Sequence, residues 1–140
     1  MLNLKPYSAV VLAFGGLLLI LTGLYFIFIR PALLPEDAIY MKSGISTLEK
    51  NLPELLKWLQ KVFWVLGGYI LTSGILTIFI ALTTFRMRSY GAFSIVLLTG
   101  CSSIGLMTLV NFIIFSDFKW ILASFTLPWL SALILFRFHK

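Results

Sequence analysis

The sequence predicts an all-α, polytopic membrane protein whose four transmembrane helices form an antiparallel bundle. The chain has 140 residues, 60% of them apolar, and its mean hydropathy is +1.02. A soluble domain of this size cannot enclose so many apolar side chains in its core. A bilayer core of roughly 30 Å needs about 20 apolar residues in helical form. Four uncharged apolar runs meet or approach that length, at residues 7–29, 62–85, 91–115 and 120–136.

The first run is expected to be a retained span and not a cleaved signal peptide. It is longer than the roughly 7 to 15 apolar residues of a signal-peptide core. Arg30 and Pro31 follow it, where a cleavage site would need small residues.

The region between the first two runs, residues 31–61, is expected to be a helical loop outside the bilayer. Pro35 suits the first turn of a helix, and Glu36 and Asp37 complement the positive end of that helix. A short helix is therefore predicted from Pro35 to Ser43. The segment STLE at residues 46–49 has the form of a capping box and predicts the start of a second helix.

Pro53 is expected to begin a further helix that continues to Phe85, because proline is tolerated in the first turn of a helix but not in its interior. At about 1.5 Å per residue this helix is roughly 50 Å long, which exceeds the thickness of the bilayer core. The second span should therefore protrude from the membrane with an amphipathic first part.

Small residues recur at every seventh position in the first three runs, and they predict the faces on which the helices pack. Lipid provides little hydrophobic drive between helices, so residues that allow close backbone approach decide which faces meet. We call this set the predicted packing seam: Ala9, Gly16, Gly23, Gly67, Gly74, Ala81, Ser94, Cys101 and Thr108.

Polar residues near the ends of the runs are candidates for a polar mouth that receives a headgroup or substrate. Exposed ion pairs between loops, which contribute little to stability, explain the charged members equally well. An interhelical hydrogen bond is the common use of an asparagine in a span. The predicted polar mouth consists of Arg30, Glu36, Asp37, Asn111, Asp117 and Lys119.

Charge and composition exclude several functions. The formal charge of +6 lies outside the apolar runs, where basic residues reflect membrane topology and contact with lipid headgroups, so nucleic acid is not an expected partner. The single cysteine, Cys101, excludes a two-cysteine redox pair. No catalytic triad or metal-ligand spacing is recognisable. We expect no catalytic residues, no cofactor and no metal, and therefore not an enzyme.

Two functions from different classes are expected. A charge at membrane depth usually marks a transport or catalytic site, and its absence favours a small non-catalytic protein that acts as a subunit, assembly or interaction partner of another membrane protein, or that self-associates. The alternative is a small four-helix carrier or flippase for a lipid-linked or apolar substrate. A polar, enclosed cavity reaching Asn111 would favour the carrier, and a solid bundle would favour the partner.

Two resemblances bear on the carrier alternative. In length and number of spans the chain resembles four-helix multidrug transporters, whose mechanism relies on a glutamate embedded in the first span; here that run has no carboxylate. The resemblance therefore does not imply proton-coupled export. The fragments Asn111-Phe112 and Lys119-Trp120 are similar to a short asparagine–aromatic and basic–tryptophan signature of polyprenol-linked sugar flippases, which implies a lipid-linked substrate.

Both termini are expected to be cytoplasmic, in a plasma (inner) membrane. The loop between the second and third runs is short and purely basic, with Arg86 and Arg88, and cytoplasmic loops are rich in such residues. With Lys5, Arg137 and Lys140, this side holds five basic residues and no acidic one. The other side holds six basic residues and all five acids.

Overall fold

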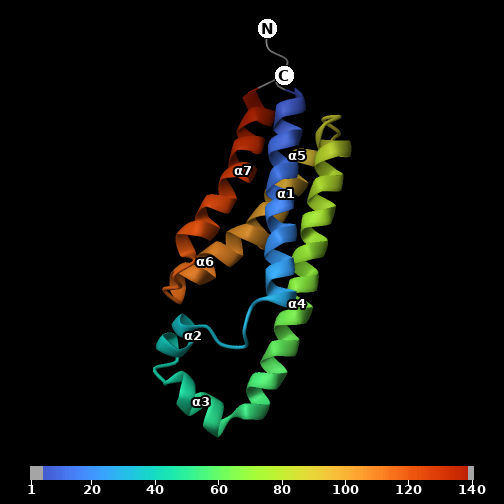
Figure 1. Ribbon diagram of the computed structural model, residues 1–140. Helices are drawn as coiled ribbons and strands as arrows, with labels where there is room; N and C mark the ends of the chain where they lie inside the picture. Colours follow the sequence, from blue (N-terminus) through green and yellow to red (C-terminus); the bar gives the residue numbers. More distant parts are fainter. Residues whose placement is uncertain (1–4, 139–140) are drawn as a thin grey trace.

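A computed structural model describes residues 5–138, and the regular elements of this part of the chain are helices. Four of them are long and apolar enough to cross a membrane, and they form an antiparallel bundle (Figure 1). The predicted all-α, four-span architecture is thus confirmed. The first span is α1 (Lys5–Phe28); the second is α4 (Pro53–Ile80) continued by η1 (Ala81–Phe85); the third joins α5 (Ala92–Gly100), η2 (Cys101–Gly105) and α6 (Leu106–Ile113); and the fourth is α7 (Lys119–Phe138).

The loop helices are α2 (Pro35–Tyr40) and α3 (Ile45–Asn51), which lie below the bundle in Figure 1. Helix α2 begins at the predicted proline but ends before Ser43, because Lys42 adopts a left-handed φ of 53° that a helix cannot continue. The predicted capping box is wrong. Helix α3 begins at Ile45, and its N-cap is Gly44, with no hydrogen bond from a side chain.

The second span begins where the sequence predicted. Pro53 occupies the first turn of α4, and helix continues through η1 to Phe85, a length of 33 residues. The lower part of α4 extends beyond the end of α1, so that α2 and α3 lie beside this extension (Figure 1). The long helix predicted from Pro53 to Phe85 is therefore present.

Helices α1 and α4 pack through glycines with their backbones in close approach. A Cβ added to Gly16 would lie 2.9 Å from the Gly74 carbonyl oxygen, and one added to Gly23 would lie 2.8 Å from the Gly67 carbonyl oxygen. The same antiparallel register pairs Ala9 with Ala81, which are 2% and 0% exposed. The members of the predicted packing seam on the first two spans thus lie in one contact between α1 and α4.

The third span packs on a different face from the one predicted. Ser94 and Cys101 are exposed, so their assignment to the predicted packing seam is wrong. Thr108 does reach α7, where its hydroxyl donates a hydrogen bond to the Leu122 carbonyl at 3.1 Å. The residues of this span that are buried recur at every fourth position: Ala92, Val96, Gly100 and Ile104.

A tryptophan explains why the third span turns this face inward. Trp129 of α7 is 3% exposed, and its ring carbons lie 2.6 Å from a Cβ added at Gly15 of α1 and 2.5 Å from one added at Gly100. The indole ring therefore fills the space that two glycines leave free on the neighbouring spans. Burial of this large ring against both glycines sets the rotation of α5. The residue that faces inward is therefore Gly100 and not its neighbour, the predicted Cys101.

The third span crosses the bundle obliquely. Helix α5 contacts η1 near one end, whereas α6 contacts α7 and diverges from the lower half of α4 (Figure 1). Between them lies the π-helical turn η2, in which the Leu106 N–H bonds to the Cys101 carbonyl. A π-turn inserts extra backbone into a helix and often marks a functional site. The divergence of α6 from α4 leaves a space between these two helices.

Candidate functional site

The space between α4 and α6 is a cavity of about 850 Å³. Helix α1 supplies residues from its second half, α4 and α6 line the two sides, α7 adds residues near its start, and α2 contributes to the lower end. Tyr69 of α4 and Leu106 of α6 line this cavity and are 71% and 53% exposed. The cavity is therefore open between these two helices, and its volume is in the range that accommodates a small-molecule ligand.

Most of the cavity is lined by apolar side chains at the depth of the membrane spans, such as Leu19, Ile70 and Met107. Two of its hydroxyl groups are already occupied: Thr22 donates to the carbonyl of Leu18 at 2.8 Å, and Ser73 donates to the carbonyl four residues before it at 2.9 Å. Hydroxyls bonded back to their own helix compete little for a polar ligand. This part of the cavity is suited to an apolar chain.

The lower end of the cavity is charged, and Arg30 is its fixed cation. The residue follows α1, and its side chain is 8% exposed. Its guanidinium donates one hydrogen bond to Asp37 at 3.1 Å and one to the Pro31 carbonyl at 2.9 Å, and it lies 3.5 Å from the centre of the Phe63 ring. Burial lowers the pKa of Arg30, and the neighbouring Asp37 carboxylate opposes this change.

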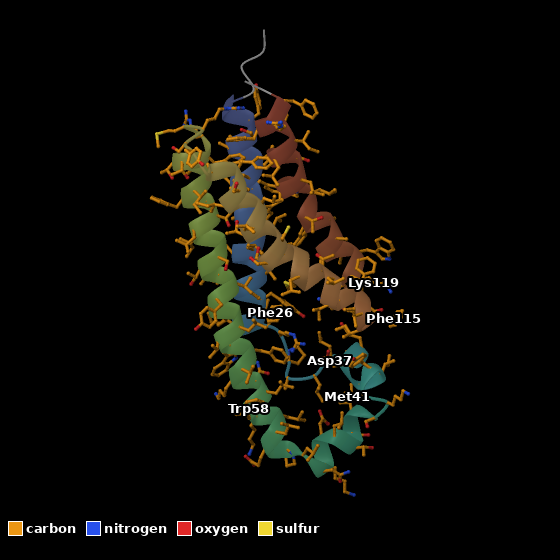
Figure 2. All side chains as sticks on the ribbon, turned by 180° about the vertical axis from the view of Figure 1, so that it is seen from behind. Phe26, Asp37, Met41, Trp58, Phe115 and Lys119 are labelled. Atoms are coloured by element: carbon orange, nitrogen blue, oxygen red, sulfur yellow. The ribbon has the colours of Figure 1, made fainter. Side chains whose placement is uncertain are left out.

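Helix α2 and the lower part of α4 hold this ion pair in place. The Asp37 carboxylate also accepts a hydrogen bond from the backbone N–H of Leu34 at 2.9 Å, at the start of α2. Gln60 of α4 donates its side-chain amide to the Arg30 carbonyl at 3.0 Å. Figure 2 shows Asp37 below Phe26, between the lower parts of α4 and α6. The Arg30 guanidinium is thus held by Asp37, the Pro31 carbonyl and the Phe63 ring, and Gln60 holds the backbone of the same residue.

Glu36 lies next to this pair but is held by a neutral group. The residue is 6% exposed, and its carboxylate accepts a hydrogen bond from the hydroxyl of Ser116 at 3.1 Å. Ser116 precedes α7, and its hydroxyl oxygen accepts the backbone N–H of Phe118 at 3.1 Å. This contact joins α2 to the loop between α6 and α7. The ion pairs formed by residues 5–138 do not include Glu36.

The predicted polar mouth is brought together only in part. Arg30, Glu36, Asp37 and Asn111 line the cavity, and Asp117 and Lys119 do not.

Asn111 does not bridge two helices. Its side-chain amide donates to the carbonyl of Met107 on the same helix at 2.9 Å. Asp117 is exposed, and the Lys119 ammonium lies 5.8 Å from the centre of the Phe115 ring, at the outer edge of the bundle (Figure 2). Helix α7 begins at Lys119, and its first turn lines the cavity through Ile121 and Leu122 but not through Lys119.

Three further residues shape the charged end without having been singled out from the sequence. Gln60 and Phe63 belong to the long α4, where nothing in the sequence distinguishes them from the other polar and apolar residues of the helix. Ser116 is a common type of loop residue. Glu36 and Ser116 are 80 residues apart in the chain, so no local sequence pattern indicates that they form a hydrogen bond. Gln60 and Phe63 contact Arg30, and Ser116 contacts Glu36 of α2, so only the folded chain brings these groups together.

Residues 5–138 contain no group of three or more His, Cys, Asp or Glu side chains that could hold a metal ion. Comparisons with known protein families, with curated proteins and with solved structures give no match. The functional argument therefore rests on the cavity and its charged end.

Proposed function

We propose that this protein is a small carrier that binds one lipid-like amphiphile in the cavity between α4 and α6. The observation that supports it is the division of the cavity into an apolar part at the depth of the spans and a charged end at Arg30, Glu36 and Asp37. An amphiphile has the same division, with an apolar chain and a polar headgroup. The opening between α4 and α6 would let the chain enter from the lipid phase.

The charge distribution supports an amphiphile over a fully apolar ligand. Burying charged groups carries a desolvation cost even when they are paired or hydrogen-bonded, and this protein keeps Arg30 and Glu36 almost fully buried beside an open cavity. An apolar ligand would gain nothing from these groups. A headgroup can bond to them, so the cost of their burial is offset when the ligand is bound.

The test is ligand binding by variants that fill the cavity. Ser73→Trp on α4 and Ser103→Trp on η2 place an indole in the cavity from opposite walls, and Ser94→Trp is the matched control because Ser94 is exposed and is not a lining residue. Delipidated protein in detergent is titrated with dioleoyl phosphatidylethanolamine, and bound lipid is counted by native mass spectrometry. We expect both cavity variants to lose affinity by roughly tenfold or more, and the control to bind as the wild type does.

The carrier step is measured with the same proteins in liposomes, as transbilayer movement of phosphatidylethanolamine labelled on its acyl chain. The two cavity variants should slow this movement, and Ser94→Trp should not. If both cavity variants fold with wild-type unfolding temperatures and still bind the lipid with wild-type affinity, the proposal is wrong.

A second candidate is a subunit or interaction partner of another membrane protein. The observation that favours it is the protruding part of α4, which exposes the apolar side chains of Leu55 and Trp58 at 48% and 62%. Affinity purification from native membranes tests it. A co-purifying protein lost on substitution of Trp58 by Gln would support this candidate, and purification of the chain alone would oppose it.

We also propose that both termini lie on the cytoplasmic side of a plasma (inner) membrane. In support, Arg86 and Arg88 follow η1 at the end of the bundle where α1 begins and α7 ends (Figure 1). Arg137 lies in the last turn of α7 at this same end. Lys140, which contributes to the basic side in the sequence, lies outside the described residues. Cytoplasmic ends of spans are enriched in such residues.

A further inference from the structure

The headgroup that the cavity accepts is limited by the charges at its lower end. The described lining residues that carry charge are Arg30, Glu36 and Asp37, one cation and two anions. Arg30 forms its ion pair with Asp37 at 3.1 Å and also attracts Glu36 at longer range, so that one cation faces two carboxylates. The carboxylate of Glu36 remains as a negative charge at the cavity wall.

Glu36 has the features of a ligand-binding carboxylate. It is 6% exposed and lines the cavity, so little bulk water reaches it. The hydrogen-bond donor that contacts it is the hydroxyl of Ser116, a neutral group. An ionised carboxylate accepts several hydrogen bonds and is stabilised most by a charged donor.

On this basis we propose that the cavity selects an amphiphile whose headgroup carries a protonated amine, and that the amine bonds to the Glu36 carboxylate. The inference rests on the proposed function, because it assumes that an amphiphile occupies the cavity. A zwitterionic headgroup fits this end because its ammonium bonds to Glu36 and the headgroup carries no net negative charge. A purely anionic headgroup would meet the Glu36 carboxylate, which forms no salt bridge, and be repelled.

The experiment compares three lipids with identical dioleoyl chains. Phosphatidylethanolamine has an amine, phosphatidylglycerol has an anionic headgroup without an amine, and dioleoylglycerol has a neutral hydroxyl. Affinities are measured on the delipidated full chain by native mass spectrometry. We expect the wild type to bind phosphatidylethanolamine about tenfold more tightly than either of the other lipids, since hydrogen bonds between charged groups are the strong ones.

Glu36→Gln removes the charge and keeps an oxygen that can accept the Ser116 hydrogen bond. We expect this variant to reduce the preference for the amine lipid to less than twofold. Asp117→Asn is the control, because it removes a negative charge from the adjacent loop without altering a cavity residue. It should retain the wild-type preference.

The possible outcomes separate this inference from the proposed function. If the wild type binds the three lipids equally, and Ser73→Trp abolishes binding of all of them, then the cavity is a lipid site and the selection of an amine is wrong. The inference is likewise overturned if Glu36→Gln keeps the full preference. If Ser73→Trp and Ser103→Trp affect the binding of none of the lipids, both the inference and the proposed function fail.

Discussion

The close contact between α1 and α4 makes a quantitative prediction for Gly74→Ala. The added Cβ would lie 2.7 Å from the Gly16 carbonyl oxygen and 2.8 Å from the backbone nitrogen of Ile20. Both neighbours are backbone atoms, so a side-chain rotation cannot relieve the overlap. Ordinary contact begins at 3.4 Å, and the two helices must therefore separate locally by about 0.7 Å.

The cost follows from the dispersion energy lost across the contact. A gap of this size removes roughly a quarter to a half of each atom pair's attraction of about 0.1–0.2 kcal/mol. If about 30 atom pairs around Gly74 are affected, roughly half the number a buried leucine makes, the loss is about 1.5 kcal/mol. That value lies within the range of about 1–3 kcal/mol typical of overpacked cores.

Gly68→Ala is the matched control on the same helix. A Cβ at Gly68 meets no atom within 4 Å, and both variants gain the same helix propensity of about 1 kcal/mol from replacing glycine by alanine. The difference between the two variants therefore isolates the steric cost.

The assay is the free energy of unfolding in mixed micelles with increasing dodecyl sulfate, followed by tryptophan fluorescence. We expect Gly74→Ala to be less stable than Gly68→Ala by about 1.5 kcal/mol. Equal stabilities within about 0.5 kcal/mol would refute the close-contact argument.

Two further predictions concern the charged end and the orientation of the chain. Arg30→Gln leaves the Asp37 carboxylate without its cation and should lower the free energy of unfolding by about 3 kcal/mol. The double variant Arg30→Gln with Asp37→Asn should regain roughly half of this loss. If the losses of the two single variants simply add, the two side chains do not interact. For orientation, cysteines are introduced at the exposed Met87 and Lys50 in a Cys101→Ser background. In intact cells a membrane-impermeant maleimide should label the cysteine at position 50 and leave the one at position 87 unlabelled, and the reverse pattern would place the termini outside.

The contact between the first two spans illustrates how far sequence reasoning reaches. Glycine at every seventh position on both runs restricts the contact to one face of each helix, because only glycine allows the backbones to approach so closely. Gly16 and Gly74 do meet in this way. The same reasoning was wrong for Ser94 and Cys101, because a series of small residues does not show whether a large ring elsewhere fills the space beside it.

The candidate site shows a second limit. Arg30 and Asp37 are seven residues apart, and their pairing could be suspected from the sequence. The partner of Glu36 lies 80 residues away in the chain, and Asp117, only one residue further along, faces solvent. Neighbouring loop residues can point in opposite directions, so sequence proximity could not separate the members of the cavity from the residues outside it.

By itself, the sequence determined that the protein has four apolar helices, where each begins and ends to within a few residues, and that Pro53 begins the longest one. These properties are local, because transfer of a helix into lipid depends on the length and composition of a single segment. Only the tertiary structure decided the rotation and tilt of the third span and, with them, the cavity between α4 and α6. Those features depend on the shapes of several helices at once, and above all on the fit of Trp129 against Gly15 and Gly100.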